Sequence, residues 1–177
     1  MVNFAIVTLL APLLAGIVGA APIPEATDLS RRAAFVQQQY AQFQISDGTA
    51  GNAAAKANAV FVDPFKGQDL STISAATISA LNTMREAAET AETAQFDPQI
   101  AKASGAAATA LTNGKIQNKV LKLTGEVQVI NIKIAQAKAK GSSTSSLESS
   151  LTAETTKLNN NIALDKKAAG QASKGVA

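Results

Sequence analysis

The sequence contains no cysteine, no histidine and no tryptophan, and aromatic residues make up only 4% of it. Without cysteine no disulfide can hold the fold, so the chain depends on its hydrophobic core. Without histidine or cysteine, the common zinc sites and the common pairs of nucleophile and base cannot be built. We therefore predict a protein that is not an enzyme and that binds no metal and no cofactor.

Two catalytic alternatives remain among the residues. A serine could act as a nucleophile with a lysine as its base, but the sequence contains no motif typical of such a pair. Glu86, Glu89 and Glu92 could supply the two carboxylates of a glycosidase, but aromatic residues to line a sugar cleft are scarce. Because these glutamates recur at a helical spacing, they share one side of a helix, and we interpret them as a solvent-exposed face.

The amino-terminal residues carry no charged side chain and end in the small residues Gly19 and Ala20, which is the pattern of a signal peptide. A membrane anchor needs about 20 uninterrupted apolar residues, whereas Pro12 and Gly16 interrupt this run. We predict a signal peptide over residues 1–20 with cleavage after Ala20, and an uncleaved anchor is the alternative. The protein is then secreted and extracellular, in the medium or at the cell wall.

Arg31 and Arg32 form a dibasic pair shortly after the predicted signal. Residues 21–32 are then either a pro-segment that a secretory-pathway protease removes at this pair, or a flexible start with two solvated arginines. The remaining residues, 33–177, suffice for one domain with a sizeable core, and we expect a single helical bundle there.

The sequence after the signal favours helices, because alanine is abundant and aromatic residues are few. Asp28-Leu29-Ser30 predicts a helix start, and Val36, Tyr40 and Phe43 then lie on one apolar stripe that we assign to the core.

Two further helices are expected in the middle of the chain. The first covers residues 52–62 and ends before the proline that follows. The second begins at Ser71 or Ser74 as N-cap. It should break at Phe96-Asp97-Pro98, where Asp97 would cap another helix and the proline would be its first residue.

The strongest pattern is a heptad seam, in which apolar residues alternate spacings of four and three. It consists of Ile116, Val120, Leu123, Val127, Ile130, Ile134 and Ala137. A turn at Gly141 and a capping box from Ser145 to Glu148 come next. A second run follows: Leu147, Leu151, Leu158, Ile162, Asp165, Ala169 and Ala172. The two runs predict an antiparallel helical hairpin.

Residues 127–134, VQVINIKI, are rich in β-branched residues and could by themselves form a strand. The seven-residue pattern extends well beyond this window, so length favours a helix. Leu121, Val129 and Ile132 lie off the seam and give this helix a second apolar side, which predicts a central position. Together the elements predict an all-α fold: a single helical bundle of about four to five helices that ends in a long antiparallel helical hairpin.

Five lysines flank the seam and form a candidate interaction face: Lys115, Lys119, Lys122, Lys133 and Lys140. One interpretation is a solvated or intramolecularly paired flank that attracts the glutamates in the middle of the chain. The other is a basic face for anionic lipid or polysaccharide. Nucleic acid is not expected as a partner, since arginine is scarce after Arg32 and no aromatic side chains offer a stacking platform.

Four segments together resemble small secreted proteins of filamentous fungi: FVDPFKGQDLS, FDPQIAKAS, NGKIQNKVLKLTGEV and LTAETTKLNNNIALDKKAAGQAS. The resemblance covers most of residues 60–175. Such proteins are uncharacterised and are often described as candidate effectors, so the resemblance implies secretion and a fungal source and supplies no active residue. A looser likeness, in architecture and composition alone, is to fungal hydrophobic-surface-binding and cell-wall mannoprotein domains, which are thought to bind lipids or apolar surfaces.

These observations predict a secreted, non-catalytic interaction protein, a candidate effector or cell-wall-associated factor that acts through the surface of its bundle. Its partner is a protein, a cell-wall polysaccharide or a lipid. The alternative is a binder or carrier of lipids or hydrophobic surfaces, because an interface of small side chains opens at low cost. We expect a monomer, although a seam shared between two chains would give a homodimer.

Overall fold

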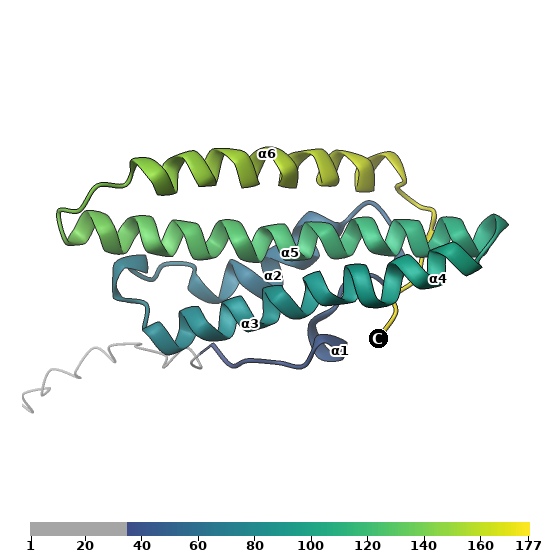
Figure 1. The fold of residues 1–177 in the computed structure, drawn as a ribbon, viewed down its shortest axis with the longest axis horizontal. Helices are drawn as coiled ribbons and strands as arrows, with labels where there is room; N and C mark the ends of the chain where they lie inside the picture. The colour runs from purple at the N-terminus through teal and green to yellow at the C-terminus, as the bar shows by residue number, and fades with distance from the viewer. Residues whose placement is uncertain (1–34) are drawn as a thin grey trace, which may run out of the picture. The chain divides into compact units, whose positions relative to one another are not determined.

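The computed structural model describes residues 35–177, which form one helical bundle (Figure 1). The predicted signal peptide over 1–20, the segment 21–32 and the predicted helix start at residues 28–30 lie outside these residues. The same holds for the predicted cleavage positions Ala20, Arg31 and Arg32.

The described chain is mostly helical, which confirms the predicted all-α class. Its elements are α1 (Tyr40–Phe43), β1 (Gly48–Thr49), α2 (Ala53–Phe61), η1 (Asp63–Phe65), η2 (Leu70–Thr72), α3 (Ala75–Ala91), η3 (Glu92–Phe96), α4 (Asp97–Lys102), α5 (Gly105–Ala139), α6 (Ser145–Lys167) and β2 (Ala172–Ser173). The two short strands pair antiparallel, with Gly48 opposite Ser173, and so join the start of the described chain to its end.

Helix α5 is 35 residues long and runs through the middle of the bundle (Figure 1). It packs against α2, α3 and α6, and buried residues occur on several of its sides. Residues 127–134 lie inside it, so the helical interpretation of this window is confirmed. Between residues 35 and 177 no helix combines the length and apolar character that crossing a membrane requires.

Helices α5 and α6 form the predicted antiparallel hairpin (Figure 1). The turn between them uses Gly141 at φ 66°, a left-handed conformation that glycine adopts without strain, and the Ser142 N–H donates to the Ala137 carbonyl at 2.9 Å. Helix α6 begins at Ser145, and the Thr144 hydroxyl before it donates to the Glu148 carboxylate at 2.9 Å. The predicted capping box from Ser145 to Glu148 is therefore wrong, because Thr144 is the N-cap and its side chain accepts no hydrogen bond from the backbone of the first turn.

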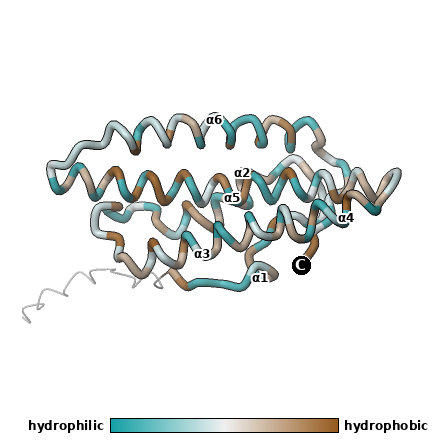
Figure 2. The backbone as a smooth tube through the Cα atoms, in the orientation of Figure 1, coloured by the Kyte–Doolittle hydropathy of each residue, from teal (hydrophilic) through white to brown (hydrophobic). Residues whose placement is uncertain are grey.

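The hydrophobic core lies where α2, α3 and α5 meet. Its least exposed members include Phe61, Leu81, Met84, Leu121 and Ile132. The Phe43 ring meets the Phe61 ring edge-on, with centroids 6.1 Å apart. In Figure 2 apolar colour is frequent along α5 and sparse along α6, so α6 contributes least to the core.

The predicted stripe of Val36, Tyr40 and Phe43 is wrong in part. Phe43 is buried, but residues 35–39 are not helical and Val36 is 68% exposed. A single helical turn begins only at Tyr40, where Gln39 and Gln42 cap each other. The Phe35 ring packs on Phe65 instead, with centroids 5.3 Å apart, so a tertiary contact holds this segment extended.

The predicted break at Phe96-Asp97-Pro98 is also wrong, because the chain passes from α3 to α4 without leaving the helical conformation. A π-helical turn, Glu92–Phe96, connects them, and Pro98 lies in the first turn of α4. Asp97 is not an N-cap, and its carboxylate is free to pair with Lys115.

Tyr40 is the single tyrosine of a chain without tryptophan, and its hydroxyl donates to Asn118 at 2.8 Å. Burial disfavours the tyrosinate and raises the pKa of Tyr40 from 10.0 to about 12. The folded state therefore holds this proton more tightly than the unfolded state, and we expect stability to fall as pH rises from 10 to about 12.

A pH titration of the tyrosinate absorbance, which reports Tyr40 alone, should have its midpoint well above that of a denatured sample. Denaturant unfolding of Tyr40→Phe, followed by circular dichroism, should lack the alkaline loss. A midpoint equal to that of the denatured chain would contradict this assignment.

Candidate functional site

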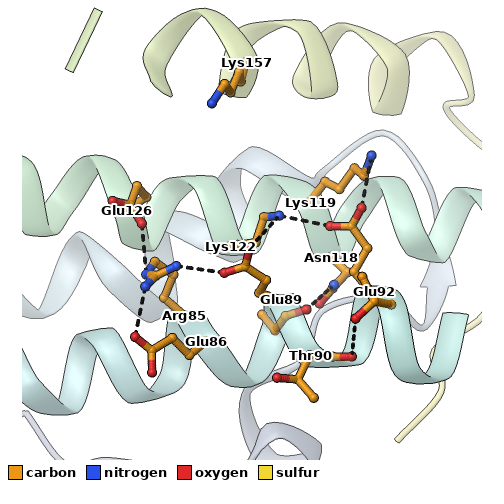
Figure 3. A network of polar contacts seen from close by, with 12 residues as sticks. Arg85, Glu86, Glu89, Thr90, Glu92, Asn118, Lys119, Lys122, Glu126 and Lys157 are labelled. Atoms are coloured by element: carbon orange, nitrogen blue, oxygen red, sulfur yellow. Dashed lines mark hydrogen bonds and ion pairs between the residues drawn. The ribbon is translucent and has the colours of Figure 1, made fainter. Parts of the chain in front are cut away.

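Opposite charges face each other along α3 and α5 (Figure 3). The Glu92 carboxylate, at the end of α3, lies 3.1 Å from Lys119 Nζ and 3.0 Å from Lys122 Nζ, both on α5. Lys115, one turn earlier on α5, pairs with Asp97. The antiparallel course of the two helices brings these residues together, because Glu92 and Asp97 meet the first half of α5.

Arg85 continues the same line toward the start of α3. Its guanidinium contacts Glu86 at 3.1 Å and Glu89 at 3.0 Å on its own helix, and Glu126 of α5 at 2.9 Å (Figure 3). The Arg85 side chain is only 18% exposed. A planar guanidinium with several donors can bridge three carboxylates in this way, which an ammonium group does less well.

The five predicted lysines share one side of α5 but differ in their surroundings. Lys115, Lys119 and Lys122 are paired with acidic residues as described. Lys133 and Lys140 are exposed, and within residues 35–177 neither makes an ion pair. The first half of the lysine face is thus neutralised within the molecule, and its second half is open.

The interpretation of the three glutamates as a solvent-exposed face needs correction. The Glu92 side chain is only 12% exposed, and the Glu86 and Glu89 side chains, although 62% and 53% exposed, both pair with Arg85. Spacing along the helix identified their common side correctly, but it could not show that α5 lies against that side.

Glu92 should make stability sensitive to acid. Burial alone would raise the pKa of Glu92, but the ammonium groups of Lys122 and Lys119 outweigh burial and hold this pKa below its usual value. A lowered pKa contributes stability above the unfolded-state pKa, and the contribution disappears as pH falls through the folded-state pKa.

At neutral pH we expect Glu92→Gln to lower the free energy of unfolding by about 1 kcal/mol, a value reduced for partial solvent screening. The loss should vanish in acid. Urea unfolding at a series of pH values tests this, with the more exposed Glu86→Gln as control. An equal loss at all pH values would show that the charge of Glu92 is not what stabilises the fold.

Helices α3, α5 and α6 enclose a polar cleft of about 290 Å³, called here the charged cleft. Its lining residues are Arg85, Glu89, Lys122, Leu123, Glu126, Glu154 and Lys157. Lys157, on α6, projects toward the other helices (Figure 3). It pairs with Glu154 at 2.8 Å. Cationic and anionic side chains from three helices therefore line the cleft, together with one apolar residue, Leu123.

The side chains of the charged cleft differ in how firmly they are held. Arg85 and Lys122 are largely covered and fixed by ion pairs, whereas Lys157 and Glu89 are more than half exposed. The cleft presents donors and acceptors to a polar or charged partner. No group of histidine, cysteine or acidic residues in the described part of the chain is arranged to hold a metal ion.

A second concavity, the apolar pocket, lies between the extended segment 35–38 and helices α2 and α3. Its volume is about 360 Å³, and it is lined by Phe35, Val36, Gln38, Ala59, Val60, Pro64 and Met84. Gln38 is the only polar side chain among them. A pocket of this size and lining suits an apolar ligand, with one amide to orient a polar end.

Asp165 stands in a largely apolar run of the sequence, and the pattern predicted no role for it. The structure buries this carboxylate, with 2% exposure, and it accepts from Gly51 N at 2.9 Å, Ala53 N at 2.8 Å and Gln117 Nε2 at 3.3 Å. Asp165 thus caps α2 from the far end of α6. The sequence contained one indication of this role: Asp165 is a charged residue at a seam position of the hairpin, where apolar residues are expected.

Comparison with curated proteins and with solved structures found no significant match. A family model described as a domain of unknown function (DUF8454) matches residues 35–177, the same residues that form the bundle. The match covers the charged cleft, the apolar pocket and the Asp165 cap. The chain belongs to this family, DUF8454.

Proposed function

We propose that the protein is a secreted, non-catalytic interaction protein that binds a charged partner through the surface of its helical bundle. The observation that carries the proposal is the charged cleft, where three helices converge on one opening lined by both signs of charge. The charge-free apolar amino terminus supports an extracellular location. The partner is then a protein or a cell-wall polysaccharide.

The charged cleft suits binding because part of it is already ordered. Ion pairs to Glu92 and Glu126 hold Lys122 and Arg85 in place, so a partner need not immobilise them. Lys157 is 61% exposed, and within residues 35–177 it makes a single ion pair, so it can exchange Glu154 for a group of the partner. The ordered side chains Lys122 and Arg85 and the exposed side chain Lys157 correspond to the buried centre and the solvent-accessible rim of a typical interface.

A retention assay tests the proposal. The purified protein is passed over an acidic polysaccharide, the uncharged polysaccharides chitin and glucan, anionic liposomes and hydrophobic beads, each at low and high salt. We expect salt-sensitive retention on the acidic polysaccharide, because screening weakens exposed charge pairs. Lys157→Glu should then reduce retention markedly.

Lys66→Glu is a matched control. Lys66 is 68% exposed and pairs with Asp63 three residues away at 2.8 Å, as Lys157 pairs with Glu154 at 2.8 Å, but Lys66 lies outside the cleft. The control should bind as the unchanged protein does. Equal losses in both variants would mean that net charge, and not the cleft, governs binding.

A second candidate function, a binder or carrier of lipids or hydrophobic surfaces, is favoured by the apolar pocket. Val36 is 68% exposed at its rim, and Met84, which is buried, also lines it. Salt-resistant retention on hydrophobic beads would support this candidate. A fatty acid that occupies the pocket should also raise the melting temperature, because a ligand bound only by the native state stabilises it.

A further inference from the structure

The turn between α5 and α6 carries five hydroxyl side chains in succession, the sequence SSTSS of residues 142–146. All of them except Thr144, which is half-buried, are exposed. A Cβ atom placed on Gly141, just before them, would meet nothing within 4 Å beyond its neighbours in the chain. In Figure 1 the turn lies at one end of the bundle. The serine hydroxyls are therefore accessible to a large molecule such as a modifying enzyme.

The backbone at the start of this run belongs to no helix. Helix α5 ends at Ala139 and α6 begins at Ser145, so Ser142 and Ser143 lie between them. The Ser143 hydroxyl is 3.2 Å from that of Ser145, a contact that two exposed groups can exchange for water. Exposed loop tips with small polar residues are where enzymes that act on a polypeptide gain access to it. Ser142 and Ser143 thus combine a free side chain with an accessible backbone.

Ser149 and Ser150 provide an internal comparison. They are exposed as well, but they lie inside α6. Their hydroxyls donate to the backbone carbonyls of Ser145 and Ser146 at 3.0 and 3.1 Å. The hydroxyl and the backbone of each of these serines are therefore engaged within the helix. The two pairs are alike in residue type and exposure and differ in local structure.

We propose that Ser142 and Ser143 are sites of O-linked glycosylation. This inference rests on the extracellular location in the proposed function, because a secreted chain passes the transferases that add such sugars. Segments rich in serine and threonine are typical acceptors. In the reaction the serine oxygen bonds to the anomeric carbon of a sugar, and the bond from that carbon to its phosphate-linked carrier breaks. The serine proton passes to a base of the transferase, and the carrier leaves with its phosphate.

The position of the turn keeps an attached sugar away from the charged cleft. The first cleft residue along α6 is Glu154. It lies more than two helical turns, about 14 Å, beyond Ser145 at the start of the helix. A sugar on Ser142 or Ser143 would therefore cover the end of the hairpin and leave the cleft open to its partner.

Intact-mass spectrometry of the full chain, secreted from a eukaryotic host that adds O-linked sugars, tests the inference. The chain contains no Asn-x-Ser/Thr sequence, so N-linked sugar does not contribute to the mass. We expect species heavier than the polypeptide by one or more whole sugar units, which peptide fragmentation should place on Ser142 and Ser143. The double variant Ser142→Ala with Ser143→Ala should lack these units. The matched control, Ser149→Ala with Ser150→Ala, should keep them.

Three results would overturn the inference, and they have different meanings. Secretion of an unmodified chain, or sugar on Ser149 and Ser150 to the same extent, would show that the turn is not the specific acceptor and would leave the proposed function intact. A mass gain of phosphate in place of sugar would assign the turn to a kinase. Retention of the whole chain inside the cells would remove both the inference and the secreted character of the proposed function.

Discussion

Asp165→Ala should lower the free energy of unfolding by about 3 kcal/mol, the largest loss expected from any polar substitution in this fold. The substitution leaves the N–H groups of Gly51 and Ala53 and the amide of Gln117 without their acceptor in a buried place. It also removes the cap of α2, which by itself is worth about 1 kcal/mol. Urea unfolding followed by circular dichroism measures the loss.

Asp63→Ala is the control for Asp165→Ala. Asp63 is also close to a helix start, but its side chain is 43% exposed and pairs with Lys66 on the surface, so its loss should cost under about 1 kcal/mol. If Asp165→Ala were equally mild, the carboxylate would not be the link between α6 and α2.

Gly114→Ala should destabilise the protein by about 1 to 3 kcal/mol, although alanine ordinarily favours a helix over glycine by about 1 kcal/mol. A Cβ atom at Gly114 would overlap the backbone carbonyl of Lys174 and would lie 3.1 Å from the Phe96 ring. The carboxyl-terminal segment passes directly over this glycine, where Lys174 N donates to the Ala110 carbonyl at 3.0 Å. Thermal unfolding measures the effect.

A truncated chain gives the matched control for Gly114→Ala. Without residues 174–177 the backbone carbonyl of Lys174 is gone, and the Phe96 ring can shift by a few tenths of an ångström. In that background the alanine should be neutral or stabilising, because only its helix propensity remains. An equal loss in both backgrounds would place the conflict inside α5 and not at the carboxyl-terminal segment.

The sequence predicted the long helices best, because their apolar residues recur at a regular spacing over many turns. The heptad seam from Ile116 to Ala137 identified α5 and outweighed the strand-like composition of residues 127–134, because a pattern over many turns averages out local preference. The residues off the seam, such as Leu121 and Ile132, correctly indicated a helix that is covered on two sides. The hairpin followed from the turn at Gly141.

The features that the sequence did not predict depend on contacts between distant residues. The π-helical turn carries the chain past Pro98 and buries Phe96, which a local rule for proline cannot foresee. Val36 fits the helical stripe by spacing but is exposed, because the Phe35 ring packs on Phe65 and holds this segment extended.

The charged cleft was predicted in part. The lysines and glutamates were each identified, and their mutual attraction was among the interpretations, but the pairing of Lys122 with Glu92 required the register of α3 against α5. Lys157 could not be assigned to the same site, because nothing in its neighbourhood along the chain shows that α6 leans over the cleft. The role of Asp165 likewise depends on Gly51, which is 114 residues away in sequence.

Hydrogen exchange of the protein, with and without the material that retains it in the binding assay, tests the central claim most directly. We expect added protection on α3, α5 and α6 around the residues that line the charged cleft: Arg85, Glu89, Lys122, Glu126 and Lys157. Protection confined to residues 35–38 and α2, beside the apolar pocket, would contradict the charged cleft as the binding site.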